Sequence, residues 1–178
     1  LLENARALLV FSCFFKGPLA AQARRIGQSV LKAELAEQIL PDGGHFERSP
    51  MYHSIVLHRL LELSFLLGPD DPLVIEHVLP KIHAMTRWLR LILCPDGDLP
   101  LLGDTARGYA PAPCALLGLQ SAIDQGGGCT YSSHNLNVLP DTGLVVYRRD
   151  RLWAIVDVGP VCPPYLPAHG QSDTGTIE

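Results

Sequence analysis

The chain has 178 residues, of which 47% are hydrophobic and 18% are charged, and its formal net charge is −4. This composition excludes a disordered or low-complexity chain, because nearly half of the residues are available to build a core. The acidic balance disfavours a nucleic-acid-binding protein, which usually carries a surplus of Lys and Arg. The length predicts one ordinary domain, or one domain and part of another.

Cysteine spacing and hydropathy exclude two further classes. Five cysteines occur without a CxxC pair, which argues against a zinc ribbon or a thioredoxin-type motif, and we expect reduced thiols that are mostly buried. The apolar segment 1–15 is interrupted by Glu3 and Arg6 and is too short to cross a membrane. The chain starts without Met and ends in a segment with an extended pattern, so we expect a fragment of a longer protein.

Helical hydrophobic periodicity dominates the first two thirds of the chain. Gly and Pro divide it into four long helices joined by short turns, which is typical of antiparallel helix hairpins. Ser49 is expected to cap the third helix, with Pro50 at its first position. The predicted helices span 1–15, 19–40, 50–67 and 71–94, and a short fifth helix spans 114–123.

A different pattern follows the glycine-rich segment 126–128. Residues 144–147 (LVVY) and 152–158 (LWAIVDV) alternate as strands do and predict a β-hairpin, preceded by a turn at 141–143. Two strands alone are marginally stable, so we expect further strands to complete the sheet. The sequence therefore predicts a helical region followed by the start of a β-sheet domain.

The densest polar cluster lies at 42–53 (DGGHFERSPMYH), where a turn enters the third predicted helix. The free N–H groups of a helix N-terminus favour anions, and Arg48 adds a planar cation suited to a carboxylate or sulfate. Tyr52 lies one turn into the helix, whereas His53 points about 100° away from it. The alternative interpretation is a capped helix with an ordinary surface turn.

Two other polar segments are candidates for binding. His169, Gln171 and Asp173 alternate and would share one face of a strand, where a polar substrate or a metal could be held. Gln is a poor metal ligand, which favours an ordinary polar face. The segment 96–105 contains Asp104 but lacks the Glu of an EF-hand loop, and it predicts a turn or a loop at the rim of a cleft.

Several segments, in this order, resemble the heparinase II/III-like polysaccharide lyases: LLENARALLVFSCFFKG, EQILPDGGHFERSPMYHSIVLHRLLEL, DGDLPLLGDTA, LPDTGLVVYRRDR and PAHGQSD. The resemblance implies an α+β fold with part of an α/α toroid in 1–125, a linker in 126–137 and the start of an antiparallel β-sandwich in 138–178. It also implies β-elimination of a uronate-containing acidic polysaccharide, such as heparan sulfate or alginate. The implied setting is a bacterial periplasmic or secreted enzyme without a membrane span or a nucleic-acid partner.

The same resemblance implies roles for individual residues. Tyr52 and His169 are the expected catalytic residues, and the expected substrate-binding residues are His45, Glu47, Arg48 and Asp104. The family's Asn-His pair, which includes the group that neutralises the substrate carboxylate, falls before Leu1, so we expect the chain alone to be inactive.

Gln171 marks a departure from the family pattern, because a zinc-binding His often stands at this place. We therefore expect no cofactor and no metal site. Gln171 also favours a second hypothesis, a non-catalytic relative that binds acidic glycans. A third hypothesis is a structural helical domain whose polar clusters are only caps and turns.

Overall fold

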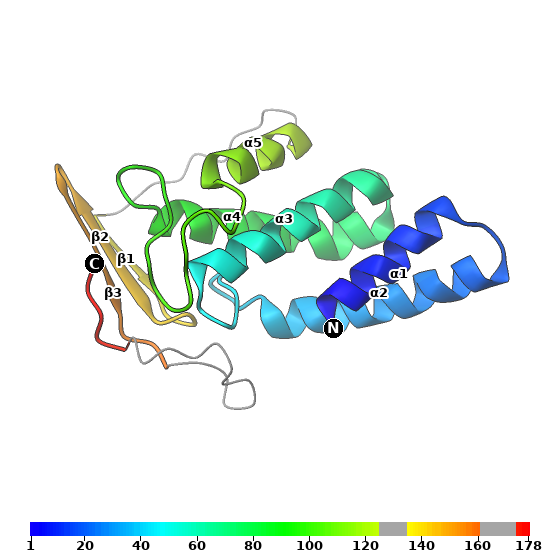
Figure 1. Cartoon of the computed structure of the whole chain (residues 1–178), viewed down its shortest axis with the longest axis horizontal. Helices are drawn as coiled ribbons and strands as arrows, with labels where there is room; N and C mark the ends of the chain where they lie inside the picture. The colour runs from blue at the N-terminus through cyan, green and yellow to red at the C-terminus, as the bar shows by residue number, and fades with distance from the viewer. Residues whose placement is uncertain (125–134, 161–173) are drawn as a thin grey trace.

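The computed structural model describes residues 1–124, 135–160 and 174–178. Helices fill most of the described molecule, and a sheet lies at the end opposite the α1–α2 hairpin (Figure 1). The helical elements are α1 (Leu2–Phe14), α2 (Pro18–Gln38), α3 (Pro50–Leu67), η1 (Val74–Val78), α4 (Leu79–Ile92) and α5 (Pro113–Ile123), and the strands are β1 (Leu136–Leu139), β2 (Leu144–Arg149) and β3 (Leu152–Asp157). This order confirms the predicted α+β class, with helices followed by antiparallel strands.

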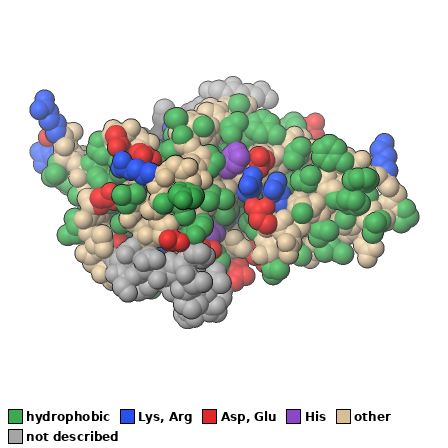
Figure 2. Space-filling view, in the orientation of Figure 1, with side chains coloured by type: hydrophobic (Ala, Val, Ile, Leu, Met, Phe, Trp, Pro, Cys, Tyr) green, Lys and Arg blue, Asp and Glu red, His purple; other side chains and the backbone are tan. Residues whose placement is uncertain are grey.

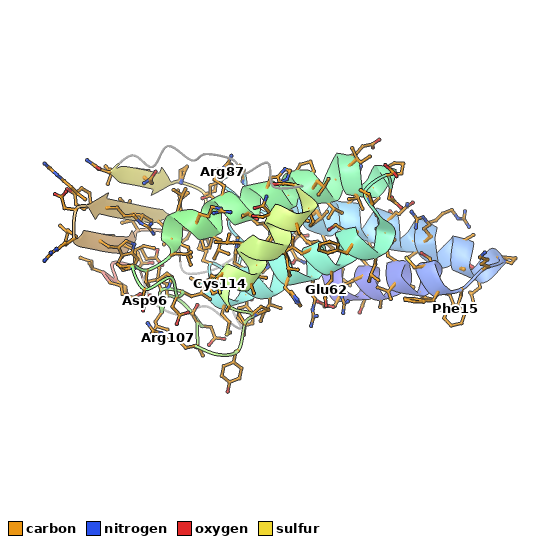
Figure 3. All side chains as sticks on the ribbon, turned by 90° about the horizontal axis from the view of Figure 1, so that it is seen from above. Phe15, Glu62, Arg87, Asp96, Arg107 and Cys114 are labelled. Carbon is orange, nitrogen blue, oxygen red and sulfur yellow. The ribbon has the colours of Figure 1, made fainter. Side chains whose placement is uncertain are left out.

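Proline and glycine set the helix ends as expected. Pro18 and Pro50 occupy the first positions of α2 and α3, where a missing N–H costs nothing. Gly17 (φ +103°) precedes α2 and Gly68 (φ +91°) follows α3, in backbone conformations that other residues rarely adopt. The Phe15 label in Figure 3 marks the end of α1 that is farthest from the sheet.

The fourth predicted helix differs from the structure near its start. A π-helical turn, η1, precedes α4, and the N–H of Leu79 donates to the carbonyl of Val74. Pro80 follows at the second position of α4. A proline ring crowds the carbonyl one turn earlier and has no N–H to donate, which accounts for the wider turn.

The core joins both parts of the molecule. Trp88 and Leu89 of α4 are fully buried, and they belong to the same hydrophobic cluster as Leu144 and Val146 of β2. Helices α1 and α2 approach closely at Gly27, where an added Cβ would lie 2.9 Å from Leu9 Cγ. The helical region and the sheet therefore share one packed interior.

Charged side chains connect α1 to α3 on the surface. Arg6 Nε lies 2.9 Å from Glu3 Oε2, and Arg59 Nη1 lies 2.9 Å from Glu62 Oε2. Arg6 and Arg59 also bridge the two helices through Glu62 and Glu3. The group is visible as adjoining blue and red side chains near the centre of Figure 2. Exposed pairs of this kind contribute at most about 1 kcal/mol each.

The described strands form one antiparallel sheet in the order β1-β2-β3. The predicted hairpin is confirmed, with Arg149 paired to Leu152 across a two-residue turn in which Asp150 has φ +55°. Strand β1 was not predicted, and it begins at Leu136, inside the expected linker. Ile177 pairs with Val156 beside β3, in agreement with the extended pattern expected at the end of the chain.

The cysteines only partly match the expectation. Cys13 and Cys114 are exposed and Cys94 is half-buried, so the prediction of mostly buried thiols is wrong for the first two. Cys13 lies near the end of α1 and Cys114 near the start of α5, where few neighbouring elements cover them. Cys129 and Cys162 lie outside the described residues. Among the described helices, none is long and apolar enough to cross a membrane.

Candidate active site

The polar turn that ends at Ser49 starts α3 as the sequence predicted. Ser49 has extended backbone angles (φ −94°, ψ 119°), and its hydroxyl oxygen accepts the N–H of Tyr52 at 3.5 Å. Pro50 takes the first helical position. This cap fixes the first turn of α3 and places the partly exposed Tyr52 side chain at the end of the helix nearest the sheet (Figure 1).

A loop that follows α4 docks on this helix end. The Thr105 hydroxyl lies 3.2 Å from Ser49 Oγ and accepts the N–H of Met51 at 3.2 Å. The Tyr52 hydroxyl donates a hydrogen bond to Asp104 Oδ2 at 2.9 Å. Two residues that lie 52 positions apart in the sequence are thus paired directly.

The loop is held in shape at its own base. Asp96 and Arg107 lie near each other beside the sheet (Figure 3), and Arg107 Nε is 3.5 Å from Asp98 Oδ2. Thr105 was not singled out by the sequence, because Gly-Asp-Thr indicates a turn and carries no sign of its partner. The predicted loop brings Asp104 beside Tyr52, and its predicted place at the rim of a cleft stays a prediction.

The environment of Tyr52 keeps its phenol protonated. Partial burial raises the pKa of Tyr52 above its ordinary value, and the hydrogen bond to Asp104 raises it further. The negative charges of Asp104 and Glu47 act in the same direction. At neutral pH the residue therefore presents a hydroxyl that can donate a proton, and it becomes a base only when cations approach it.

Arg48 reaches from the same turn toward the sheet. Its backbone has φ +57°, and its Nη2 donates to the carbonyl of Asp141 at 3.4 Å. The Nε and Nη1 atoms are buried and have no hydrogen-bond partner among the described residues. Glu47, next to it, is half-buried. The contacts of Arg48 and Glu47 with a sugar, which the family resemblance implies, stay predictions.

His45 and His53 lie beneath the site, in the interior. His45 is only 3% exposed, and its Nε2 lies 3.3 Å from Gln38 Oε1. His53 is fully buried, and its Nε2 lies 3.1 Å from the carbonyl of Met85. Burial lowers the pKa of each imidazole to about 3, so both are neutral at physiological pH. His45 therefore helps to pack the turn, and its predicted sugar contact stays a prediction.

The second polar cluster cannot be placed in the same way. His169, Gln171 and Asp173 lie outside the described residues, and the pairing of His169 with Tyr52 stays a prediction. Within the described ranges, no group of three or more His, Cys, Asp or Glu side chains is arranged to hold a metal ion.

Comparisons with known proteins cover nearly the whole chain. Residues 1–111 match the model described as "Heparinase II/III N-terminus", and residues 132–178 match "Heparinase II/III-like, C-terminal". No curated protein matches the chain.

Solved structures show the same fold. The heparan sulfate lyase HepC from Pedobacter heparinus has a TM-score of 0.72 and 22% identity, and a structure of heparinase III has a TM-score of 0.78 and 16% identity. The heparinase III BT4657 gene product has a TM-score of 0.74 and 21% identity.

Each comparison covers 99% of this chain, which spans only about 30% of the length of these structures. The family model for the N-terminal part alone accounts for more than half of the chain. The chain belongs to the heparinase II/III-like family.

Proposed function

We propose that the whole protein containing this chain is a polysaccharide lyase that cleaves a uronate-containing acidic polysaccharide by β-elimination. The observation that carries the proposal is the partly exposed Tyr52 hydroxyl, held by Asp104 at the start of α3. Family membership and the structural similarity to the heparan sulfate lyase HepC support it.

The reaction makes three demands on the site. A base must take the proton from C5 of the uronate, and the C5–H electrons then form the C4–C5 double bond as the C4–O bond breaks. A cation or hydrogen-bond donor must stabilise the negative charge that develops on the uronate carboxylate. An acid must protonate the departing glycosidic oxygen.

Tyr52 is suited to the role of the acid. Its raised pKa leaves the proton on the hydroxyl at neutral pH, where it is available to the departing oxygen. Asp104 accepts the hydrogen bond of that hydroxyl and orients it. The family resemblance gives His169 a part in proton transfer, and in this proposal it takes the C5 proton because Tyr52 supplies the proton to the leaving oxygen.

Arg48, Glu47 and Asp104 interact electrostatically with the negatively charged substrate. Arg48 brings a guanidinium to the turn before α3, and its planar cation suits a carboxylate or sulfate. The carboxylates of Glu47 and Asp104 repel anions. Together with Arg48 they favour substrates whose anionic groups lie beside Arg48 and away from these two carboxylates. The carboxylate-neutralising group of the family falls before Leu1 in this proposal.

The domain division and the setting are part of the same proposal. We assign 1–125 to a helical domain, and we place the start of the sheet domain at β1 rather than at residue 138, because β1 begins at Leu136. A bacterial periplasmic or secreted enzyme fits a polymeric substrate that does not enter the cytoplasm.

The test uses the whole protein and several uronate polymers, with heparan sulfate and alginate among them. Unsaturated uronate products absorb ultraviolet light, so the initial rise in absorbance measures cleavage directly. We expect product from at least one polymer and none from the same polymer after its carboxyl groups have been reduced to alcohols. Failure to form product from every uronate polymer would contradict the proposal.

A non-catalytic glycan-binding protein is the second candidate, favoured by Gln171 at the position where the family often has a His. It predicts retention on immobilised acidic glycans without any product. Retention that is unchanged in Tyr52→Phe, together with an absence of product, would support this candidate over the lyase.

A further inference from the structure

The turn between β1 and β2 is bound to the helical region through hydrogen bonds of Thr142. Thr142 is fully buried, and both its N–H and its hydroxyl donate to Asp42 Oδ2, at 2.7 and 2.8 Å. The indole N–H of Trp88 donates to the Thr142 hydroxyl oxygen at 3.0 Å. One hydroxyl therefore joins a loop, a helix and the sheet, and it links residues 100 positions apart.

The backbone at Gly43 and Gly44 packs tightly against this contact. An added Cβ on Gly44 would lie 2.1 Å from Thr142 Cγ2 and 2.7 Å from Trp88 Nε1. One on Gly43 would lie 2.2 Å from the carbonyl oxygen of Ala84. The N–H of Gly44 also donates to Asp42 Oδ1 at 3.0 Å, so both carboxylate oxygens of Asp42 are engaged.

The same loop leads directly into the first turn of α3. Residues 42–48 connect the Asp42 contact to the Ser49 cap, and Arg48 donates to the carbonyl of Asp141 in the same β1–β2 turn. Two contacts, one at each end of the loop, thus hold the turn of the sheet against the helix end that carries Tyr52. On its other side the turn contacts the residue that follows β3, because the N–H of Val158 donates to the carbonyl of Gly143 at 2.8 Å.

We propose that Thr142 is a positioning residue, whose hydroxyl fixes the sheet against the α3 N-terminus and thereby sets the place of Tyr52 relative to the sheet domain. Thr142 is fully buried and therefore does not touch a substrate. The effect on turnover rests on the proposed function, whereas the effect on local structure does not.

Replacing Thr142 by Val removes one hydroxyl and keeps the shape. Asp42 Oδ2 then loses one of its two donors from residue 142 and keeps the other, whereas the indole N–H of the fully buried Trp88 loses its acceptor. Buried polar groups left without partners destabilise the contact that contains them. We expect the loop 42–48 and the first turn of α3 to open more often.

The experiment compares Thr142→Val, Thr142→Ser and Thr86→Val in the whole protein. Thr86 is a matched control, because it is equally buried in α4 and its hydroxyl has no hydrogen-bond partner among the described residues. Amide hydrogen exchange over 42–53 and the steady-state constants on the cleaved polymer are measured for each variant.

Thr142→Val is expected to speed exchange over 42–53 by about tenfold, the change that corresponds to one lost buried hydrogen bond. It is expected to lower kcat by about 10- to 100-fold with KM within about twofold, because a misplaced acid costs the transition state more than binding. Thr142→Ser is expected to keep the exchange rate over 42–53 and kcat at their wild-type values, and Thr86→Val is expected to change neither.

Unchanged exchange in Thr142→Val overturns the proposal, and so does a kcat within about twofold of wild type alongside faster exchange. If the wild type forms no product from any polymer, the proposed function fails and the positioning claim is judged by exchange over 42–53 alone. The two failures are therefore distinguishable.

Discussion

At the scale of single residues, the hydrogen bond between Tyr52 and Asp104 is central to the proposed chemistry. Asp104 has two effects, since it orients the hydroxyl and raises the pKa of the phenol. A donor with a raised pKa suits protonation of a leaving oxygen better than abstraction of a carbon-bound proton. In the proposed mechanism the two proton transfers therefore belong to different residues.

Asp104→Asn is expected to lower the pKa of Tyr52 toward its ordinary value, because the substitution removes a negative charge and an acceptor that stabilises the neutral phenol. The measurement is an alkaline titration of tyrosinate absorbance, taken as the difference between Asp104→Asn and the Tyr52→Phe/Asp104→Asn double variant. Asp70→Asn, on an exposed turn, is the control and leaves the titration of Tyr52 unchanged. An unchanged or higher pKa in Asp104→Asn would show that Asp104 does not act on the phenol.

His45 and His53 predict a loss of stability in acid. Their folded-state pKa values of about 3 lie below the ordinary value of 6.5, so the unfolded chain binds more protons between these limits. The free energy of unfolding should be constant above about pH 6.5 and should fall by about 2 kcal/mol per histidine by pH 5.

Urea unfolding at pH 7 and pH 5 measures the difference, and His53→Gln should reduce the dependence on pH. A free energy of unfolding that is equal at the two pH values would contradict the buried, neutral state of both rings.

At the scale of elements, glycine position decides how closely helices pack. Gly27 and Gly118 both lie inside helices, α2 and α5. A Cβ on Gly27 would meet Leu9 Cγ at 2.9 Å and the carbonyl oxygen of Ala5 at 3.1 Å, whereas Gly118 faces open space. The same substitution should therefore have opposite effects at the two positions.

Gly118→Ala is expected to stabilise the protein by about 0.5–1 kcal/mol through helix propensity. Gly27→Ala gains the same propensity but forces α1 away from α2, and the net effect is a destabilisation of about 1–2 kcal/mol. Thermal unfolding of the two variants side by side provides the test. Equal stabilisation by both would mean that α1 and α2 do not approach as closely as described.

The helix ends were predictable and β1 was not, for physical reasons. Pro50 and the Ser49 cap act through their immediate neighbours, so sequence alone identifies the start of α3. Strand β1 has only four residues and ends before Pro140, which is too short to show alternation. The π turn depends on Pro80 at a position where a proline is otherwise acceptable near a helix start.

At the scale of the whole molecule, pairing between distant segments makes the site. The residue pattern itself marked Asp104 and Thr142 only as turn residues, because Asp, Thr and Gly favour turns whatever lies opposite them. Asp104 was a candidate for substrate binding through the family resemblance alone. Their partners, Tyr52 and Asp42, are 52 and 100 positions away. Such pairs follow from the docking of whole elements, which local patterns do not encode.

The chain alone is expected to fold but to form no product from a polymer that the whole protein cleaves. The physical reason is that charge on the uronate carboxylate must be stabilised, and in the proposed mechanism the group that stabilises it lies before Leu1. Cooperative thermal unfolding of the chain is the control for folding, and ultraviolet absorbance measures product. Product from the folded chain would show that residues 1–178 contain every group that the elimination needs.

The most direct test of the central claim compares Tyr52→Phe with wild type in the whole protein. The change removes one hydroxyl, and Tyr109→Phe, on an 80% exposed loop residue, is the matched control. The initial rate of unsaturated product formation should fall by at least about 100-fold in Tyr52→Phe, the contribution expected of a positioned acid, and stay at the wild-type value in the control. A Tyr52→Phe rate equal to wild type would contradict the assignment of Tyr52 as the proton donor.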